Sequence, residues 1–171
     1  MKYKAFIVGV ALAVAATATA GAQSAGDQAF VTKLAGVAMA EVELGTLAKD
    51  KAESREVKAF GQRMIDDHTK AGDELKGIAQ RKNFAWPAAL PPDAVALKEK
   101  LSKLSGPAFD RAYIDEMVKG HTEVLSVVQK EAQSGSDPDV KAWATKATSS
   151  VQAHLTHAQN QQRELSKPAT N

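Results

Sequence analysis

The chain has 171 residues, of which 22 are lysine or arginine, 20 are aspartate or glutamate, four are histidine and none is cysteine. Without cysteine it can form no disulfide and offers no thiol nucleophile. Acidic and basic residues are interleaved along every segment, which argues against a basic surface for nucleic acid and against a polybasic membrane patch.

Residues 1–22 are typical of a secretory signal peptide. Two lysines precede an apolar run over residues 5–16, and small residues then offer cleavage after Ala22 or, as the alternative, after Ala20. The apolar run is shorter than the roughly 20 residues that a membrane-spanning helix needs. We therefore expect a mature protein without a transmembrane segment, in the periplasm or secreted. Its charge should be near zero, because cleavage removes two basic residues and no acidic one.

Apolar residues recur at helical spacing in the remainder of the chain, and no segment alternates like a strand. This pattern predicts four long helices, at residues 27–50, 54–82, 107–134 and 138–165. Ser54 and Asp137 are suitable N-caps for the second and fourth of these helices, and Gly135 suits the end of the third. Only a few residues connect the helices within each pair, so we expect two antiparallel hairpins.

The segment NFAWPAALPPD, residues 83–93, lies between the two hairpins and cannot continue a helix because it contains three prolines. A short helix is expected after it, ending at Ser105 and Gly106. A connection of this length can cross from one end of a bundle to the other, which favours an all-α, ferritin-like four-helix bundle with one long crossover. We expect one domain over residues 23–166 and a disordered tail at 167–171.

Each long helix carries one polar residue on its otherwise apolar inner face. In the second helix the apolar residues repeat at intervals of four from Phe60, and His68 falls in the same row. The equivalent residues of the other helices are Glu41, His121 and His154. All four lie within about three residues of the midpoints of their expected helices, an offset of roughly 4 Å. Because midpoints meet whichever way the helices run, the sequence predicts a polar layer at mid-bundle.

Three imidazoles and a carboxylate are a suitable ligand set for one divalent transition metal, such as zinc, iron, manganese or copper, and helix bundles commonly hold metals between facing helices. The alternative is a metal-free cluster in which Glu41 accepts hydrogen bonds from the histidines, with Tyr113, Asp67 or water completing it. Asp67 lies about 100° around the helix from His68. We therefore expect Asp67 to support the site rather than to bind directly. His157 is expected at the boundary of the bundle.

Several short motifs occur in order along the chain: AEVELG at residues 40–45, DDHTK at 66–70, a tyrosine seven residues before GH, and HL at 154–155. With these motifs, residues 27–165 resemble the secreted bacterial DUF4142 family. The resemblance implies export and a ferritin-like fold. The recurring polar positions of the family fall on Glu41, His68, His121 and His154. No activity is implied, because none is assigned to the family.

At most one metal ion is expected, because a two-iron oxidase centre takes a Glu-x-x-His motif from each of two helices and the sequence contains none. The preferred function is sequestration or buffering of one divalent ion under envelope stress. A second hypothesis is a non-enzymatic envelope interaction module in which the polar layer is structural. A third is an enzyme that uses an open position on a bound metal. It would need a pocket that reaches His121, which we expect beside Gly120.

Overall fold

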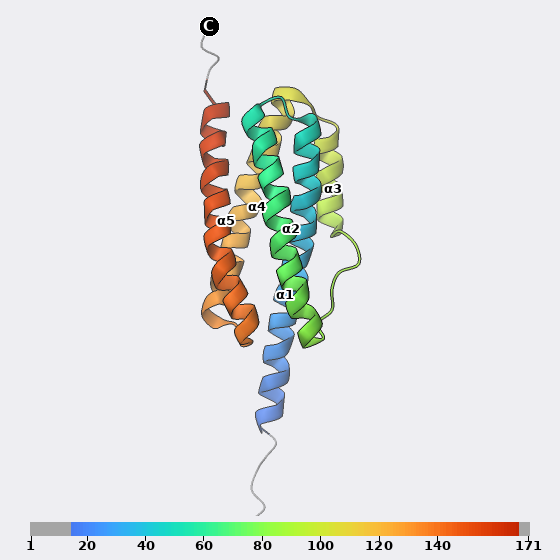
Figure 1. The fold of residues 1–171 in the computed structure, drawn as a ribbon, viewed down its shortest axis with the longest axis vertical. Coiled ribbons are helices and arrows are strands. Elements are labelled where there is room, and N and C mark those ends of the chain that lie inside the picture. Colours follow the sequence, from blue (N-terminus) through green and yellow to red (C-terminus); the bar gives the residue numbers. More distant parts are fainter. Residues whose placement is uncertain (1–14, 168–171) are drawn as a thin grey trace, which may run out of the picture.

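The computed structural model describes residues 15–167, with side chains from residue 25 onward. Its regular structure within this range is entirely helical, with α1 (Ala15–Lys51), α2 (Arg55–Lys82), α3 (Pro92–Ser102), α4 (Gly106–Ser134) and α5 (Pro138–Leu165). Four long helices, α1, α2, α4 and α5, form a bundle, and the short α3 lies outside it (Figure 1). The prediction of an all-α bundle is confirmed.

The helices follow the order of two hairpins and one crossover (Figure 1). α1 and α2 are antiparallel, and so are α4 and α5. α2 ends near the end of the bundle where the packed part of α1 begins, and residues 83–91 and α3 lead back to the opposite end, where α4 starts. As a result α2 and α4 run in the same direction. This is the long crossover, with a short helix in it, that the prolines predicted.

Local capping explains where the long helices begin and end. The Ser54 hydroxyl accepts hydrogen bonds from the first-turn amides of α2, and the Asp137 carboxylate does the same for α5. Both N-cap predictions are confirmed. Gly135 follows α4 as expected, but with a φ of −57° it is not left-handed. The left-handed cap is Asn83, with a φ of 56°, after α2. Asparagine tolerates this conformation better than most residues.

Two buried aspartates, one in each hairpin, accept hydrogen bonds from the turn of the other hairpin. Asp110, near the start of α4, accepts hydrogen bonds from the backbone amides of Glu53 and Ser54 in the turn between α1 and α2. At the opposite end of the bundle, Asp27 of α1 accepts hydrogen bonds from the amides of Ser136 and Asp137, between α4 and α5. Each turn therefore has its otherwise unpaired amides satisfied by the partner hairpin.

α1 and α2 approach closely at a pair of glycines. A Cβ atom built on Gly45 would lie 2.6 Å from the carbonyl oxygen of Gly61, and one built on Gly61 would lie 2.9 Å from the carbonyl oxygen of Gly45. Real Cβ atoms essentially never come this close to another atom. The absence of side chains at these two positions thus sets the spacing of the first hairpin.

α1 starts at Ala15, earlier than the predicted residue 27, and its first turns extend beyond the other helices (Figure 1). Residues 1–14 of the predicted signal peptide and residues 168–171 of the predicted tail lie outside the described residues. Cleavage after Ala22 stays a prediction, and it would leave the contacts of Asp27 intact. None of the helices between residues 15 and 167 is sufficiently long and apolar to cross a membrane.

Candidate metal centre

The bundle core is divided into two apolar halves with a polar layer between them. One half lies near the turn between α1 and α2 and includes Phe60, Tyr113 and Met117. The other lies near the turn between α4 and α5 and includes Leu75 and Val140. Along each long helix, one buried polar residue separates the parts that belong to the two halves: Glu41, His68, His121 and His154.

The three histidines of this layer come together from α2, α4 and α5. Their ring centroids are 5.8 Å apart for His68 and His121, 5.5 Å for His68 and His154, and 5.4 Å for His121 and His154. One ring nitrogen of each residue lies within 4.8 Å of a ring nitrogen of both others. All three side chains are buried. The structure therefore brings together three residues that lie far apart in the sequence.

A backbone contact fixes the orientation of His121. Its Nδ1 lies 2.9 Å from the carbonyl oxygen of Met117, one turn earlier in α4. Because a carbonyl can only accept, Nδ1 must carry the proton and donate it. The neutral ring then has a lone pair at Nε2, which is buried and has no hydrogen-bond partner among the described residues. That nitrogen is in the state that a metal ion requires.

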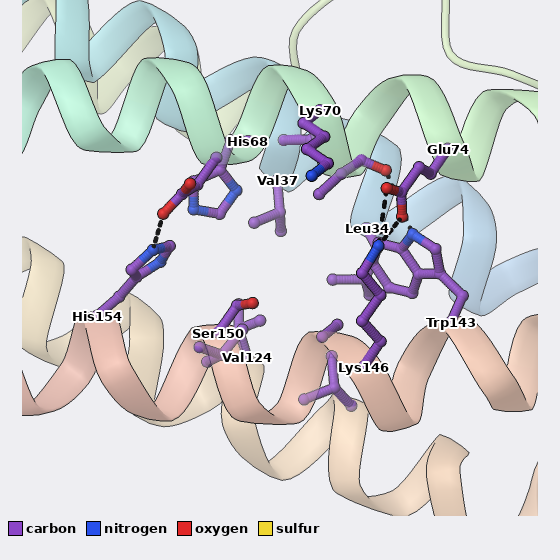
Figure 2. Close-up of a pocket in the computed structure, with 16 residues that line it drawn as sticks. Leu34, Val37, His68, Lys70, Glu74, Val124, Trp143, Lys146, Ser150 and His154 are labelled. Carbon is purple, nitrogen blue, oxygen red and sulfur yellow. Dashed lines mark hydrogen bonds and ion pairs between the residues drawn. The ribbon is translucent and has the colours of Figure 1, made fainter.

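A carboxylate fixes His154 in the same way. Its Nε2 lies 2.8 Å from Oδ2 of Asp67 in α2 (Figure 2). In the neutral ring, Nε2–H donates to the carboxylate and leaves the lone pair at Nδ1, which is buried and unpaired within the described chain. Carboxylate–histidine pairs of this kind commonly orient metal ligands. The expectation that Asp67 supports the site agrees with this contact, although it supports His154 and not its neighbour His68.

His68 is neutral for a different reason. The pKa of His68 is lowered from 6.5 to about 3, mainly by burial and to a smaller extent by the neighbouring rings of His121 and His154, against an opposing effect of Asp67. At neutral pH the imidazole therefore carries no charge, and its buried Nε2 has no hydrogen-bond partner among residues 25–167. Burial also lowers the pKa of His154, against the opposing hydrogen bond to Asp67.

Glu41 belongs to the layer but is set apart from the histidine cluster. It is buried, and its Oε2 has no hydrogen-bond partner in the described part of the chain. The group of side chains within 4.8 Å of one another contains the three histidines and not Glu41. Burial raises the pKa of Glu41, while the proximity of His121 lowers it to a smaller extent. The sequence predicted the level of Glu41 along the bundle, but it did not predict that Glu41 lies apart from the histidine cluster.

The neighbouring residues also take definite places. Tyr113 is fully buried, and its hydroxyl has no hydrogen-bond partner among the described residues. The ring of His157 packs 4.9 Å from the ring of Phe60 and is half-buried, away from the histidine cluster. A Cβ atom on Gly120 would have no neighbour within 4 Å. The pocket beside it reaches Glu41 and does not include His121 among its lining residues, so the expected route to His121 beside Gly120 is not the observed one.

These contacts leave one ring nitrogen of each of the three histidines with a lone pair that accepts no hydrogen bond within residues 25–167. A buried polar atom without a partner costs about 1–3 kcal/mol. No histidine donates a hydrogen bond to Glu41 among the described residues, whereas His154 is hydrogen-bonded to Asp67. Three buried imidazoles with one ring nitrogen each within 4.8 Å of the others fit a single borderline divalent metal ion.

The fold and the histidine layer together define a helical bundle protein with a candidate metal centre at the middle of its core. More specifically, the family model described as a domain of unknown function, DUF4142, matches residues 12–160. The chain belongs to the DUF4142 family. No curated protein matches it in sequence.

The fold is also similar to a solved structure from another family. A DUF305 protein from Streptomyces coelicolor, described as secreted, superimposes with a TM-score of 0.72 and 14% identity, over 85% of this chain and 97% of that chain. This likeness concerns the fold alone.

Proposed function

We propose that the protein binds one divalent transition metal ion through His68, His121 and His154. The observation that supports this most is the convergence of three buried histidines, each with one buried ring nitrogen that lacks a hydrogen-bond partner among the described residues. Two of the rings are oriented by partners outside the cluster, which is the usual arrangement for metal-binding histidines.

The donor set narrows the choice of ion. Imidazole nitrogens suit zinc, copper and iron, whereas manganese prefers oxygen ligands. Zinc, copper or iron is therefore favoured over manganese among the four metals expected from the sequence. The predicted set of four ligands includes Glu41, but the larger separation of Glu41 gives it a secondary role. Its carboxyl group is a charge partner next to His121, and it becomes a direct ligand only if the side chain moves.

The biological role proposed with this site is sequestration or buffering of the ion outside the cytoplasm, under envelope stress. Export is supported by the signal-like sequence of residues 1–22 and by the description of the DUF305 neighbour as secreted. A buried site of this kind is suited to holding an ion for a long time. A two-iron oxidase activity is not proposed, because the layer has three histidines and one carboxylate.

Elemental analysis of the mature protein, purified from its native compartment without chelator or affinity tag, tests the proposal. We expect about one equivalent of a single transition metal, lost in His121→Ala. The matched control is His157→Ala, since His157 is the remaining histidine of the chain and lies outside the cluster. This variant should keep the metal. Metal-free wild-type protein that also gains no thermal stability on titration with zinc, copper or iron would leave the structural polar layer as the better account.

A further inference from the structure

A cavity of about 150 Å³ leads from the surface between α2 and α5 to the histidine cluster. Figure 2 shows His68 and His154 at one end of this cavity and Glu74, Lys146 and Trp143 at the other. His121 is not among the residues that line it. The cavity therefore meets the candidate metal centre from one side, along the edges of two of the three rings.

The walls of the cavity are apolar and well supported. Leu34, Val37, Val124 and Val151 contribute aliphatic surface from three of the long helices. Trp143 forms the outer wall, and it is held in place because its Nε1–H donates to the carbonyl oxygen of Ala71 at 3.3 Å and its ring packs edge-on against Phe30. A passage walled by such residues is preformed and solvates charged molecules poorly.

The outer end of the cavity carries an excess of positive charge. Lys146 is paired with both carboxylate oxygens of Glu74 at 2.8 Å. Lys70 also lines the opening, is exposed, and has no ion-pair partner among the described residues. Two lysines and one glutamate leave about one net positive charge at the outer end, which favours the approach of small anions. Asp67 also lines the cavity, beside His154, and its carboxylate carries the opposite charge at the inner end.

The volume limits what can enter. An apolar protein cavity of about 150 Å³ is able to bind a molecule the size of benzene, so the cavity has room for a small ligand. At its inner end, a divalent ion held by three neutral imidazoles would keep a positive charge in surroundings of low polarity, where an anion is strongly attracted. Three protein nitrogens also leave the fourth position of a tetrahedral ion for an outside ligand.

We propose that the metal ion bound by the three histidines has an open coordination position that faces this cavity, and that a small monovalent anion reaches and occupies it from solvent. The inference rests on the proposed metal centre and adds to it an entry route and a class of ligand. Glu41 does not line the cavity. In this account its carboxylate is not the fourth ligand.

Cobalt(II) loading followed by titration with azide tests the inference, because the visible spectrum of cobalt reports both metal binding and a change of its ligands. We expect the wild-type protein to bind cobalt and the spectrum to change saturably with azide. Ala147→Trp, which fills the cavity from its wall, should bind cobalt but bind azide at least roughly tenfold more weakly. Ala142→Trp is the matched control, since Ala142 is an exposed alanine of the same helix outside the cavity lining. It should behave like wild type.

Ser150→Phe gives a second obstruction in case Ala147→Trp does not fold, because Ser150 is exposed at the entrance. The inference is overturned if the cobalt spectrum of wild type is unchanged by azide, or if a folded obstructed variant binds azide as wild type does. It is also overturned if only Glu41→Gln responds to azide, since Glu41 would then occupy the fourth position. A protein that shows no cobalt spectrum at all fails earlier, at the metal centre itself, so the two failures are distinguishable.

Discussion

Asp67 and His154, from two different helices, form a carboxylate–imidazole pair in which Oδ2 lies 2.8 Å from Nε2. Asp67 also accepts a hydrogen bond from Arg63 at 3.3 Å, one turn earlier in α2. Partial burial opposes ionisation of Asp67, but the hydrogen bonds from His154 and Arg63 lower its pKa. Consecutive residues of α2 thus act differently, because His68 enters the cluster while Asp67 orients a ring on the facing helix.

Asp67→Asn should weaken metal binding by about 10–100-fold, the usual cost of losing a partner that orients a metal-binding histidine. The loss arises because an amide is a weaker acceptor than a carboxylate and no longer fixes the tautomer of His154 as firmly. Titration calorimetry with zinc measures the effect. Asp66→Asn is the control, since Asp66 is exposed and contacts Gln62 on the outer surface. Equal zinc affinities for the two variants would show that the pair has no part in binding.

The metal-free protein should lose stability in acid through His68. The folded state holds the pKa of His68 at about 3, against 6.5 in the unfolded chain. Well above pH 6.5 the imidazole of His68 is unprotonated in both states. As the pH falls from 6.5 towards 3, the unfolded chain takes up a proton that the folded protein refuses, which lowers the free energy of unfolding by up to about 1.4 kcal/mol per pH unit.

His68→Gln should therefore show a shallower loss of stability between pH 6 and pH 4 than wild type, by about 1 kcal/mol per pH unit. Urea unfolding in the presence of a chelator at several pH values measures this slope. His157→Gln serves for comparison, because His157 is only half-buried and should change the slope less. The assignment to His68 is wrong if its variant keeps the wild-type slope.

The close approach of α1 and α2 should make Gly45→Ala destabilising by about 1–3 kcal/mol, because the new methyl group would meet the carbonyl oxygen of Gly61 at 2.6 Å. Gly77→Ala provides a matched substitution in α2, where the nearest atom to a new Cβ is a side-chain nitrogen of Arg81 at 3.6 Å. That variant should gain about 0.5–1 kcal/mol through helix propensity. Urea unfolding of both variants should give shifts of opposite sign. Shifts of the same sign would contradict the observed spacing.

Asp110→Asn should lower the free energy of unfolding by about 1–3 kcal/mol, since an amide side chain can accept from only one of the two turn amides that the carboxylate satisfies. Asp73→Asn, at an exposed position of α2, removes the same charge without such contacts. Thermal unfolding of the two variants at equal pH compares them directly. If both variants change the stability equally, the hydrogen bonds of Asp110 make no net contribution to it.

The sequence predicted those features that depend on periodicity along a single helix. Spacing of four residues placed His68 on an inner face, and the helix midpoints placed it level with His121 and His154. Caps were predictable for the same reason, because Ser54 and Asp137 act on amides two and three residues away. Each of these features is local.

Contacts between helices could not be predicted from periodicity along one helix. The pairing of Asp67 with His154 depends on α2 lying beside α5. The hydrogen bonds of Asp27 and Asp110 go to backbone amides that are 109 and 56 residues away in the sequence. Asp27 and Asp110 each begin a row of buried apolar residues, but periodicity along one helix does not show which turn of the other hairpin each one contacts. The separation of Glu41 from the histidine cluster likewise depends on side-chain directions, which the level of a residue along a helix does not determine.

X-ray absorption spectroscopy of the mature protein loaded with one equivalent of zinc identifies the atoms that bind the ion. We expect three imidazole nitrogens at about 2.0–2.1 Å from the zinc and one further oxygen or nitrogen ligand from outside the protein, with the imidazole signal reduced in His121→Ala. A zinc ion surrounded by oxygen alone, or an imidazole signal unaltered in His121→Ala, would contradict the assignment of the histidine cluster as the metal centre.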